Sequence, residues 1–421
     1  MLDWLYNQNG GSTGVAGILI SLSLMLILGF LMTRLTKLLR LPNVTAYIVT
    51  GILMGPYVLD VIPAPFIHGT EFLTDVALAF IAFSVGEHFE LSKLRKSGGK
   101  SAVITIFEAM TASLLVFILT YLILDLDFVF SIVLAALAAA TAPASTMMTI
   151  RQTQARGDYV DTLLQVVAMD DVAGLAAYSI AIAAASSILT ETSGGGTFQV
   201  VFLPLLINIL LIVLGAGFAW LLKLMTPTSR TADNRLIIAV AILLLFSGVS
   251  AVFDVSPLLG CMTMGMVFAN IEGHEKLFKQ LNYFNPPILL LFFVRSGLTF
   301  DLKALVSTKA VGPVPLALVG VLYFFVRLIG KYIGAFLGSA VTGKPKEVRN
   351  YLGLALAPQA GVAIGLAALC ARQLGPEVGG TLQTIILASS VLYELIGPAS
   401  AKLGLFLSKS YDASGQEPAG S

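Results

Sequence analysis

Charged residues are scarce in this chain of 421 residues. Asp, Glu, Lys and Arg make up 12% of it and hydrophobic residues 57%, and the mean hydropathy is +0.89. A soluble domain cannot bury that much apolar surface. The shortage of charge therefore excludes an ordinary soluble protein and favours a chain embedded in a lipid bilayer. The net charge of +1 says little about partners. No nucleic-acid partner is expected.

Cysteine and the motifs of catalysis are equally sparse. The two cysteines, Cys261 and Cys370, lie in apolar stretches, where they are expected to be buried small hydrophobic residues. They form no disulfide or metal-binding pattern. The sequence contains no nucleotide-binding loop, catalytic triad or zinc motif. We therefore expect neither an enzyme, nor an ATP-driven pump, nor a protein with a bound cofactor.

Long apolar runs take the place of these features. Runs of about 18 or more residues can cross a bilayer as helices, and they recur along most of the chain. They predict an all-α polytopic membrane protein of about thirteen transmembrane helices. The expected spans are 14–33, 42–59, 71–89, 100–124, 128–150, 160–189, 199–224, 234–253, 256–271, 282–300, 311–341, 349–371 and 380–405.

The basic residues follow an alternating pattern along this map. Most of the 25 Lys and Arg residues lie in or beside every second loop, and the intervening loops hold only Lys303, Lys309 and Arg372. Because cytoplasmic loops are enriched in Lys and Arg, the N-terminus is predicted to lie outside and the C-terminus in the cytoplasm. A cell (inner or plasma) membrane is expected, with a disordered tail over 408–421.

A few charged residues fall inside the predicted spans, where each is a functional candidate because charge in hydrocarbon is costly. The basic ones are Arg295, Arg327 and Lys331, and the deeper acidic ones are Glu108, Asp170, Asp171 and Glu394.

Asp170 and Asp171 are the strongest of these candidates. They lie about ten residues, or roughly 15 Å, from one end of their helix, which is near the middle of a bilayer core about 30 Å thick. Two adjacent carboxylates cannot both stay ionised there without a cation, a proton or a basic partner. The pair therefore indicates a site that exchanges a proton for a metal cation, although a static ion pair is the alternative.

Lys331 is predicted to lie at nearly the same depth as Asp170. A buried lysine can lose its proton when a cation takes its carboxylate partner, so it suits proton coupling, with a static brace as the alternative. Arg327 is one helical turn away and stays charged, which suits a structural ion pair with Glu108 or Glu394. The sequence leaves open which basic residue pairs with Asp170.

Two predicted helices carry helix breakers at mid-depth. The fifth has Thr141 and Pro143, and the twelfth has Pro358, Gln359 and Gly361. Broken backbone inside a membrane is tolerated where it lines a cavity or is buried in protein. The two breaks occupy corresponding positions if helices 1–6 and 8–13 are two six-helix repeats joined by helix 7. An odd linking helix makes such repeats inverted, a pattern typical of transporters.

Several segments resemble bacterial cation:proton antiporters. LPNVTAYIVTGILMGP is similar to the LPxVxGYLLAGILLGP stretch of that family, and further similar segments are TAPAST, LLQVVAMDDVAGL, VSPLLGCMTMGMVFAN, FFVRSGLTFDL, RLIGKYIGAF, APQAGVAIGLA and VLYELIGP. The resemblance covers residues 14–405. It is strongest to the branch of the monovalent cation:proton antiporter superfamily with two adjacent aspartates.

This resemblance implies a fold with two crossing broken helices (5 and 12) and a division into two parts. The core would comprise 100–189 and 311–405, the scaffold 14–89 and 234–300, and the linker 199–224. The family works as homodimers in which the core moves like an elevator.

The resemblance also assigns roles within the site. Asp171 would be the main cation and proton ligand, and Asp170 would pair with Lys331 or Arg327. Many relatives have an aspartate at the position of Ala142, so here Thr141 and backbone oxygens are expected to serve instead. Two-aspartate members are typically electrogenic. The expected function is exchange of Na⁺ or Li⁺ for H⁺; the alternatives are K⁺/H⁺ exchange, a cation channel or a non-transporting sensor.

Overall fold

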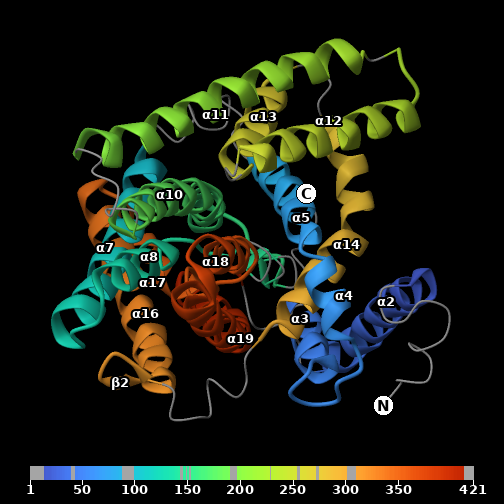
Figure 1. Ribbon diagram of the computed structural model, residues 1–421. Helices are drawn as coiled ribbons and strands as arrows, with labels where there is room; N and C mark the ends of the chain where they lie inside the picture. The colour runs from blue at the N-terminus through green and yellow to red at the C-terminus, as the bar shows by residue number, and fades with distance from the viewer. Residues whose placement is uncertain are drawn as a thin grey trace.

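The computed structural model describes residues 14–38, 43–87, 99–142, 146–147, 149–150, 153–189, 197–227, 229–253, 257–271, 275–300 and 310–411. This part of the chain is almost entirely helical (Figure 1). Its one sheet is a short hairpin of β1 (Ala310–Val311) and β2 (Val314–Pro315). The predicted tail over 408–421 lies outside the described residues from 412 onward.

Six of the described helices are long and apolar enough to cross a membrane. They are α2 (Val15–Leu38), α7 (Lys100–Phe117) with its π-helical extension η2 (Ile118–Ile123), α10 (Asp158–Leu189), α12 (Ala232–Val252), α16 (Leu316–Val341) and α19 (Gly375–Leu407). The predicted all-α membrane class is confirmed. The number of thirteen spans and the inverted repeats stay predictions.

The remaining helices are mostly shorter, with α11 (Thr197–Met225) and α14 (Glu275–Leu298) as the long exceptions. The shorter ones are α3 (Asn43–Met54), α4 (Ala64–Gly69), α5 (Phe72–Gly86), α8 (Phe128–Leu137), α13 (Leu258–Ala269), α17 (Lys346–Ala355) and α18 (Gly361–Gln373). The helix expected over 311–341 begins only at Leu316. Gly312, with a φ of +58°, and the prolines at 313 and 315 favour a turn there instead.

Both predicted helix breaks are present. α8 ends at Leu137 and is followed by non-helical backbone to Ala142. α17 ends at Ala355, and five residues separate it from α18, which begins at Gly361. Pro358 lies in the second break, where its missing N–H and its ring prevent a continuous helix. Pro143, expected at the first break, lies outside the described residues.

The helices form two groups. The site group, formed by α7, α8, α10 and α16–α19, packs around the two breaks, and the flanking group consists of α2–α5, α13 and α14. α11 runs across one side and contacts both α10 and α13 (Figure 1). The outward faces of α2, α11 and α16 expose large apolar side chains, such as Phe30, Trp220 and Phe325. Lipid contact explains this exposure, which water would oppose.

Candidate ion-binding site

A stripe of glycines brings α16 against α7. Gly330, Gly334 and Gly338 are spaced four residues apart on one face of α16. A Cβ at Gly330 would lie 2.6 Å from the Cα of Ala112, and one at Gly334 would collide with the Cα of Glu108. Small residues at this spacing let membrane helices approach backbone to backbone. This close approach of the two helices places the side chain of Lys331 at the level of Glu108.

Lys331 joins two buried carboxylates. Its Nζ lies 2.7 Å from Glu108 Oε2 on α7 and 2.8 Å from Asp170 Oδ2 on α10, and it also donates to the carbonyl of Ala139. All three charged side chains are fully buried. One ammonium group thus links α7, α10 and the broken end of α8.

Arg327 binds the broken backbone rather than a carboxylate in the contacts that the structure records. Its Nε donates to the carbonyl of Ala138 (3.0 Å), Nη2 to that of Ala140 (2.7 Å) and Nη1 to that of Ala357 (2.9 Å). Its guanidinium also lies 4.6 Å from the ring centroid of Tyr393. The first two carbonyls end α8 and the third follows α17. Because a helix carries partial negative charge at its C-terminus, Arg327 stabilises both half-helices.

The two breaks also contact each other directly. The N–H of Ala142 donates to the carbonyl of Pro358 at 2.9 Å. The side-chain amide of Gln359 donates to the carbonyl of Leu137 at 2.7 Å and accepts from the hydroxyl of Tyr323 at 3.0 Å. These bonds satisfy backbone groups that the interrupted helices leave open, as a membrane interior requires.

Asp171 differs from Asp170 in having no partner among the described residues. Asp171 is 1% exposed, and neither of its carboxylate oxygens forms a hydrogen bond with any residue that the structure describes. The hydroxyl of Thr141, 2% exposed, is likewise without a partner in the described structure. α10 packs closely on the first break, because a Cβ at Gly174 would lie only 3.0 Å from that of Ala140. Asp171 also lies within electrostatic range of Asp170 and Lys331.

The charges here do not balance. Among the described residues, the three buried carboxylates of Glu108, Asp170 and Asp171 share the one ammonium group of Lys331. Unpaired ionised carboxylates are very costly away from water, so the cluster requires either protons or a bound cation. Carboxylate, hydroxyl and carbonyl oxygens are also the ligands that hard cations prefer.

The structure decides between partners that the sequence left open. Asp170 forms its ion pair with Lys331 and not with Arg327, and Glu108 also forms an ion pair with Lys331. Glu394 is fully buried, as expected for a deep position in α19. Reasoning from the sequence missed the contribution of Tyr323 and Tyr393, as well as the glycine stripe, which the four-residue spacing of GKYIGAFLG could have indicated.

Comparison with known proteins agrees with the class that the fold indicates. Residues 20–397 match the family model described as "Sodium/hydrogen exchanger, transmembrane". The fold and the site thus define an integral membrane protein of the cation/proton antiporter class. The chain belongs to the sodium/hydrogen exchanger family, and the family membership expected from the sequence is confirmed.

Two curated relatives are similar over most of the chain. One, from Escherichia coli strain K12, is named "Putative cation/proton antiporter YbaL". It is 25% identical over an alignment of 392 residues, which covers 89% of this chain. The chain spans 66% of the length of that relative. The other is named "Ammonium/H(+) antiporter subunit AmhT", from Alkalihalophilus pseudofirmus, and is 22% identical, covering 85% of this chain and 87% of that protein.

The solved structure of the sodium proton antiporter MjNhaP1 from Methanocaldococcus jannaschii at pH 8 has the same fold. It matches with a TM-score of 0.73 at 18% identity and covers 92% of this chain and 98% of that one. At this identity the likeness concerns the fold alone. The antiporter-like fold expected from the sequence is confirmed.

Proposed function

We propose that the protein exchanges Na⁺ or Li⁺ for H⁺ across the membrane by alternating access. The observation that carries this proposal is Asp171: a fully buried carboxylate, free of hydrogen bonds within the described structure, beside the Asp170–Lys331 ion pair. Such a group must hold a proton or a cation, and it cannot hold both. One site with two mutually exclusive occupants couples their movements.

In the proposed cycle the cation binds Asp171, with Asp170 and the hydroxyl of Thr141 as further ligands. Binding displaces the proton of Asp171 and draws Asp170 away from Lys331, which then releases a second proton. When the cation leaves, Asp171 and Lys331 each regain a proton, and the ion pair between Lys331 and Asp170 re-forms. Arg327 stays charged throughout, because it holds the half-helix ends together and cannot be deprotonated.

The same charges underlie the proposed electrogenic stoichiometry. Asp171 and Lys331 each give up a proton when one monovalent cation binds. More protons than cations then cross in each cycle, and the membrane potential contributes to the driving force. Glu108 shares the ammonium of Lys331, so it is placed to hold that side chain near Asp170 when the proton returns.

The proposal extends to the whole molecule. The site group corresponds closely to the expected core over 100–189 and 311–405. The flanking group, together with α12, corresponds to the expected scaffold over 14–89 and 234–300, with the link over 199–224. We propose that the core moves against the scaffold, that the protein acts in the lipid bilayer as a homodimer, and that its C-terminus faces the cytoplasm.

K⁺ is the second candidate substrate. The oxygen ligands of the proposed site suit either ion. Of the two curated relatives, one is named only for a cation and the other for ammonium, which is close to K⁺ in size and charge. A change from Na⁺ to K⁺ would leave the mechanism intact.

The test uses proteoliposomes with an imposed pH gradient, a pH-sensitive dye and a clamped membrane potential. Addition of Na⁺ or Li⁺ is expected to dissipate the gradient, and a favourable potential to speed the response. A response to K⁺ alone would change the substrate and keep the mechanism. Cation flux without proton movement indicates a channel, and binding without any flux a sensor; either result would refute exchange.

A further inference from the structure

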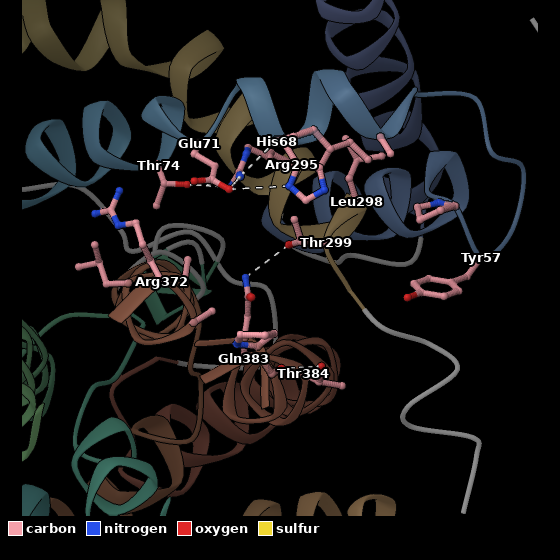
Figure 2. Close-up of a pocket in the computed structure, with 18 residues that line it drawn as sticks. Tyr57, His68, Glu71, Thr74, Arg295, Leu298, Thr299, Arg372, Gln383 and Thr384 are labelled. Atoms are coloured by element: carbon pink, nitrogen blue, oxygen red, sulfur yellow. Dashed lines mark hydrogen bonds and ion pairs between the residues drawn. The ribbon is translucent and has the colours of Figure 1, made fainter. Parts of the chain in front are cut away.

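A cavity of about 540 Å³ separates the two groups of helices at one end (Figure 2). The flanking group lines it with Ile67, Thr74 and Leu298, and the site group with Leu369 and Thr384. The cavity lies at the start of α5 and the end of α18, on the face that the Lys and Arg pattern predicts to be external. Polar contacts join the two groups at the edge of this cavity, and further along the same helices α5 and α18 pack directly at Leu78 and Gly365.

The strongest of these contacts is an ion pair between Arg372 and Asp75. Arg372 Nη1 and Nη2 donate to Asp75 Oδ2 and Oδ1 at 2.8 and 2.9 Å. The side chain of Asp75 is 17% exposed and that of Arg372 45%. Two parallel bonds of this kind fix both the distance between the two helices that bear the side chains and their relative orientation.

The two residues of this ion pair lie on helices of different groups, Asp75 in the flanking group and Arg372 in the site group. Asp75 is in the first turn of α5, which packs on α13 and α14, and Arg372 is in the last turn of α18, which packs on α19. Each charge also complements the dipole of its own helix end. A weaker bond, from Gln383 to Thr299 at 3.4 Å, joins the same groups across the cavity.

The neighbouring arginine, Arg295, shows what a contact within one group looks like. It donates to Thr74 Oγ1 at 3.1 Å and to the carbonyl of Ile67 at 3.3 Å, and Glu71 lies 4.0 Å away. All these partners belong to the flanking group. In Figure 2 these contacts stay on one side of the cavity, whereas Arg372 faces it from the site group.

We infer that Asp75 and Arg372 form an external latch, which must break each time the site group moves to open the ion site outward. The inference rests on the proposed exchange by relative movement of the two groups. The latch favours the conformation in which it is closed. Removing it enlarges the fraction of molecules open to the outside and so lowers the apparent dissociation constant for a cation arriving from there.

The first test measures KM for the cation separately on each side of the membrane. In right-side-out membrane vesicles, Asp75→Asn and Arg372→Gln are each expected to lower KM for external cation by about two- to fivefold, the range of a partly exposed ion pair. KM for internal cation, measured in inside-out vesicles, is expected to change less. The charge exchange D75R/R372D is expected to restore the wild-type KM. Equal KM values for wild type and both single variants contradict the latch.

The second test restrains the latch chemically. Cysteines replace Asp75 and Arg372 in a background where Cys261 and Cys370 are changed to alanine, and a short bis-methanethiosulfonate reagent joins them. Cross-linking is expected to stop exchange, and reduction of the cross-link is expected to restore it. Asp158 and Lys344 provide the matched control, because their ion pair of 2.8 Å lies within the site group. Cross-linking cysteines at those two positions is expected to leave exchange running.

The outcomes separate the latch from the function itself. If the unmodified protein shows no cation-driven proton movement, the proposed exchange fails. If it exchanges and the cross-linked Asp75–Arg372 variant continues to do so, the latch alone fails. Loss of exchange in the control pair as well would also overturn the inference, because movement within the site group would then be required.

Discussion

At the scale of single residues, Lys331 is central because it neutralises two buried carboxylates. Removing the ammonium leaves Glu108 and Asp170 uncompensated, and breaking a buried ion pair in this way costs about 3–5 kcal/mol of stability. We expect Lys331→Gln to lower the unfolding temperature in detergent. The double variant K331Q/E108Q removes one of the orphaned carboxylates and is expected to recover part of the loss. A double variant less stable than K331Q would contradict the ion-pair account.

Arg327 shows a different role for a buried basic side chain. Its planar group reaches three carbonyls at once, whereas a lysine ammonium lacks that fork geometry. We expect Arg327→Lys to keep the charge and still leave buried carbonyls without donors, at a cost of about 1–3 kcal/mol. The free energy of unfolding in detergent measures this loss. If R327K is as stable as the wild type, charge alone accounts for the role of Arg327.

At this scale the sequence predicted residue types better than partners. The buried acids and bases were evident, because charge stands out in an apolar run. The partners were not, since Arg327 and Lys331 are one turn apart on the same helix and either could face Asp170. Helix rotation decides the choice, and it depends on the glycine stripe against α7. The roles of Asp170, Asp171 and Thr141 as ligands stay predictions.

At the scale of elements, the contact between α7 and α16 sets the position of the ion pair. The two backbones approach at Gly330, Gly334 and Gly338, so an added methyl group at Gly334 has to push the helices apart. We expect Gly334→Ala to destabilise the protein by about 1–3 kcal/mol. It should also weaken exchange, since Glu108 moves away from Lys331.

A control for this substitution lies on the same helix. Among the described residues, no atom of a neighbouring element lies within 4 Å of the position that a methyl group on Gly320 would take. Gly320→Ala is therefore expected to be neutral or slightly stabilising. Unfolding temperatures and exchange rates of the two variants can be compared directly. Equal effects of G320A and G334A would mean that close helix approach is not what positions the ion pair.

The broken helices show which structural features were accessible from sequence. Pro358 and the small residues around it indicated the second break, and hydropathy placed most helices within a few residues. The crossing of the breaks depends on contacts between residues more than two hundred positions apart, such as Gln359 with the carbonyl of Leu137. No local pattern encodes that pairing. The hairpin before Leu316 was missed because its prolines and glycine follow a predicted helix start.

At the scale of the whole molecule, the helices divide into two groups, and the proposed exchange requires one group to move against the other. Close helix packing surrounds the breaks, whereas between the groups polar bonds bridge a cavity beside the direct contact of α5 with α18. Polar bonds at the edge of a cavity can break and re-form at modest cost. Movement is therefore expected between the groups rather than within them.

The most direct test of the central claim measures proton release when a cation binds. Purified protein in weakly buffered detergent receives Na⁺, Li⁺ or K⁺ while a pH indicator is monitored. The account predicts that the transported cation releases protons from the wild type and that Asp171→Asn abolishes or sharply reduces the release. Cation binding to the wild type without any proton release, or undiminished release from D171N, would contradict a shared site for cation and proton.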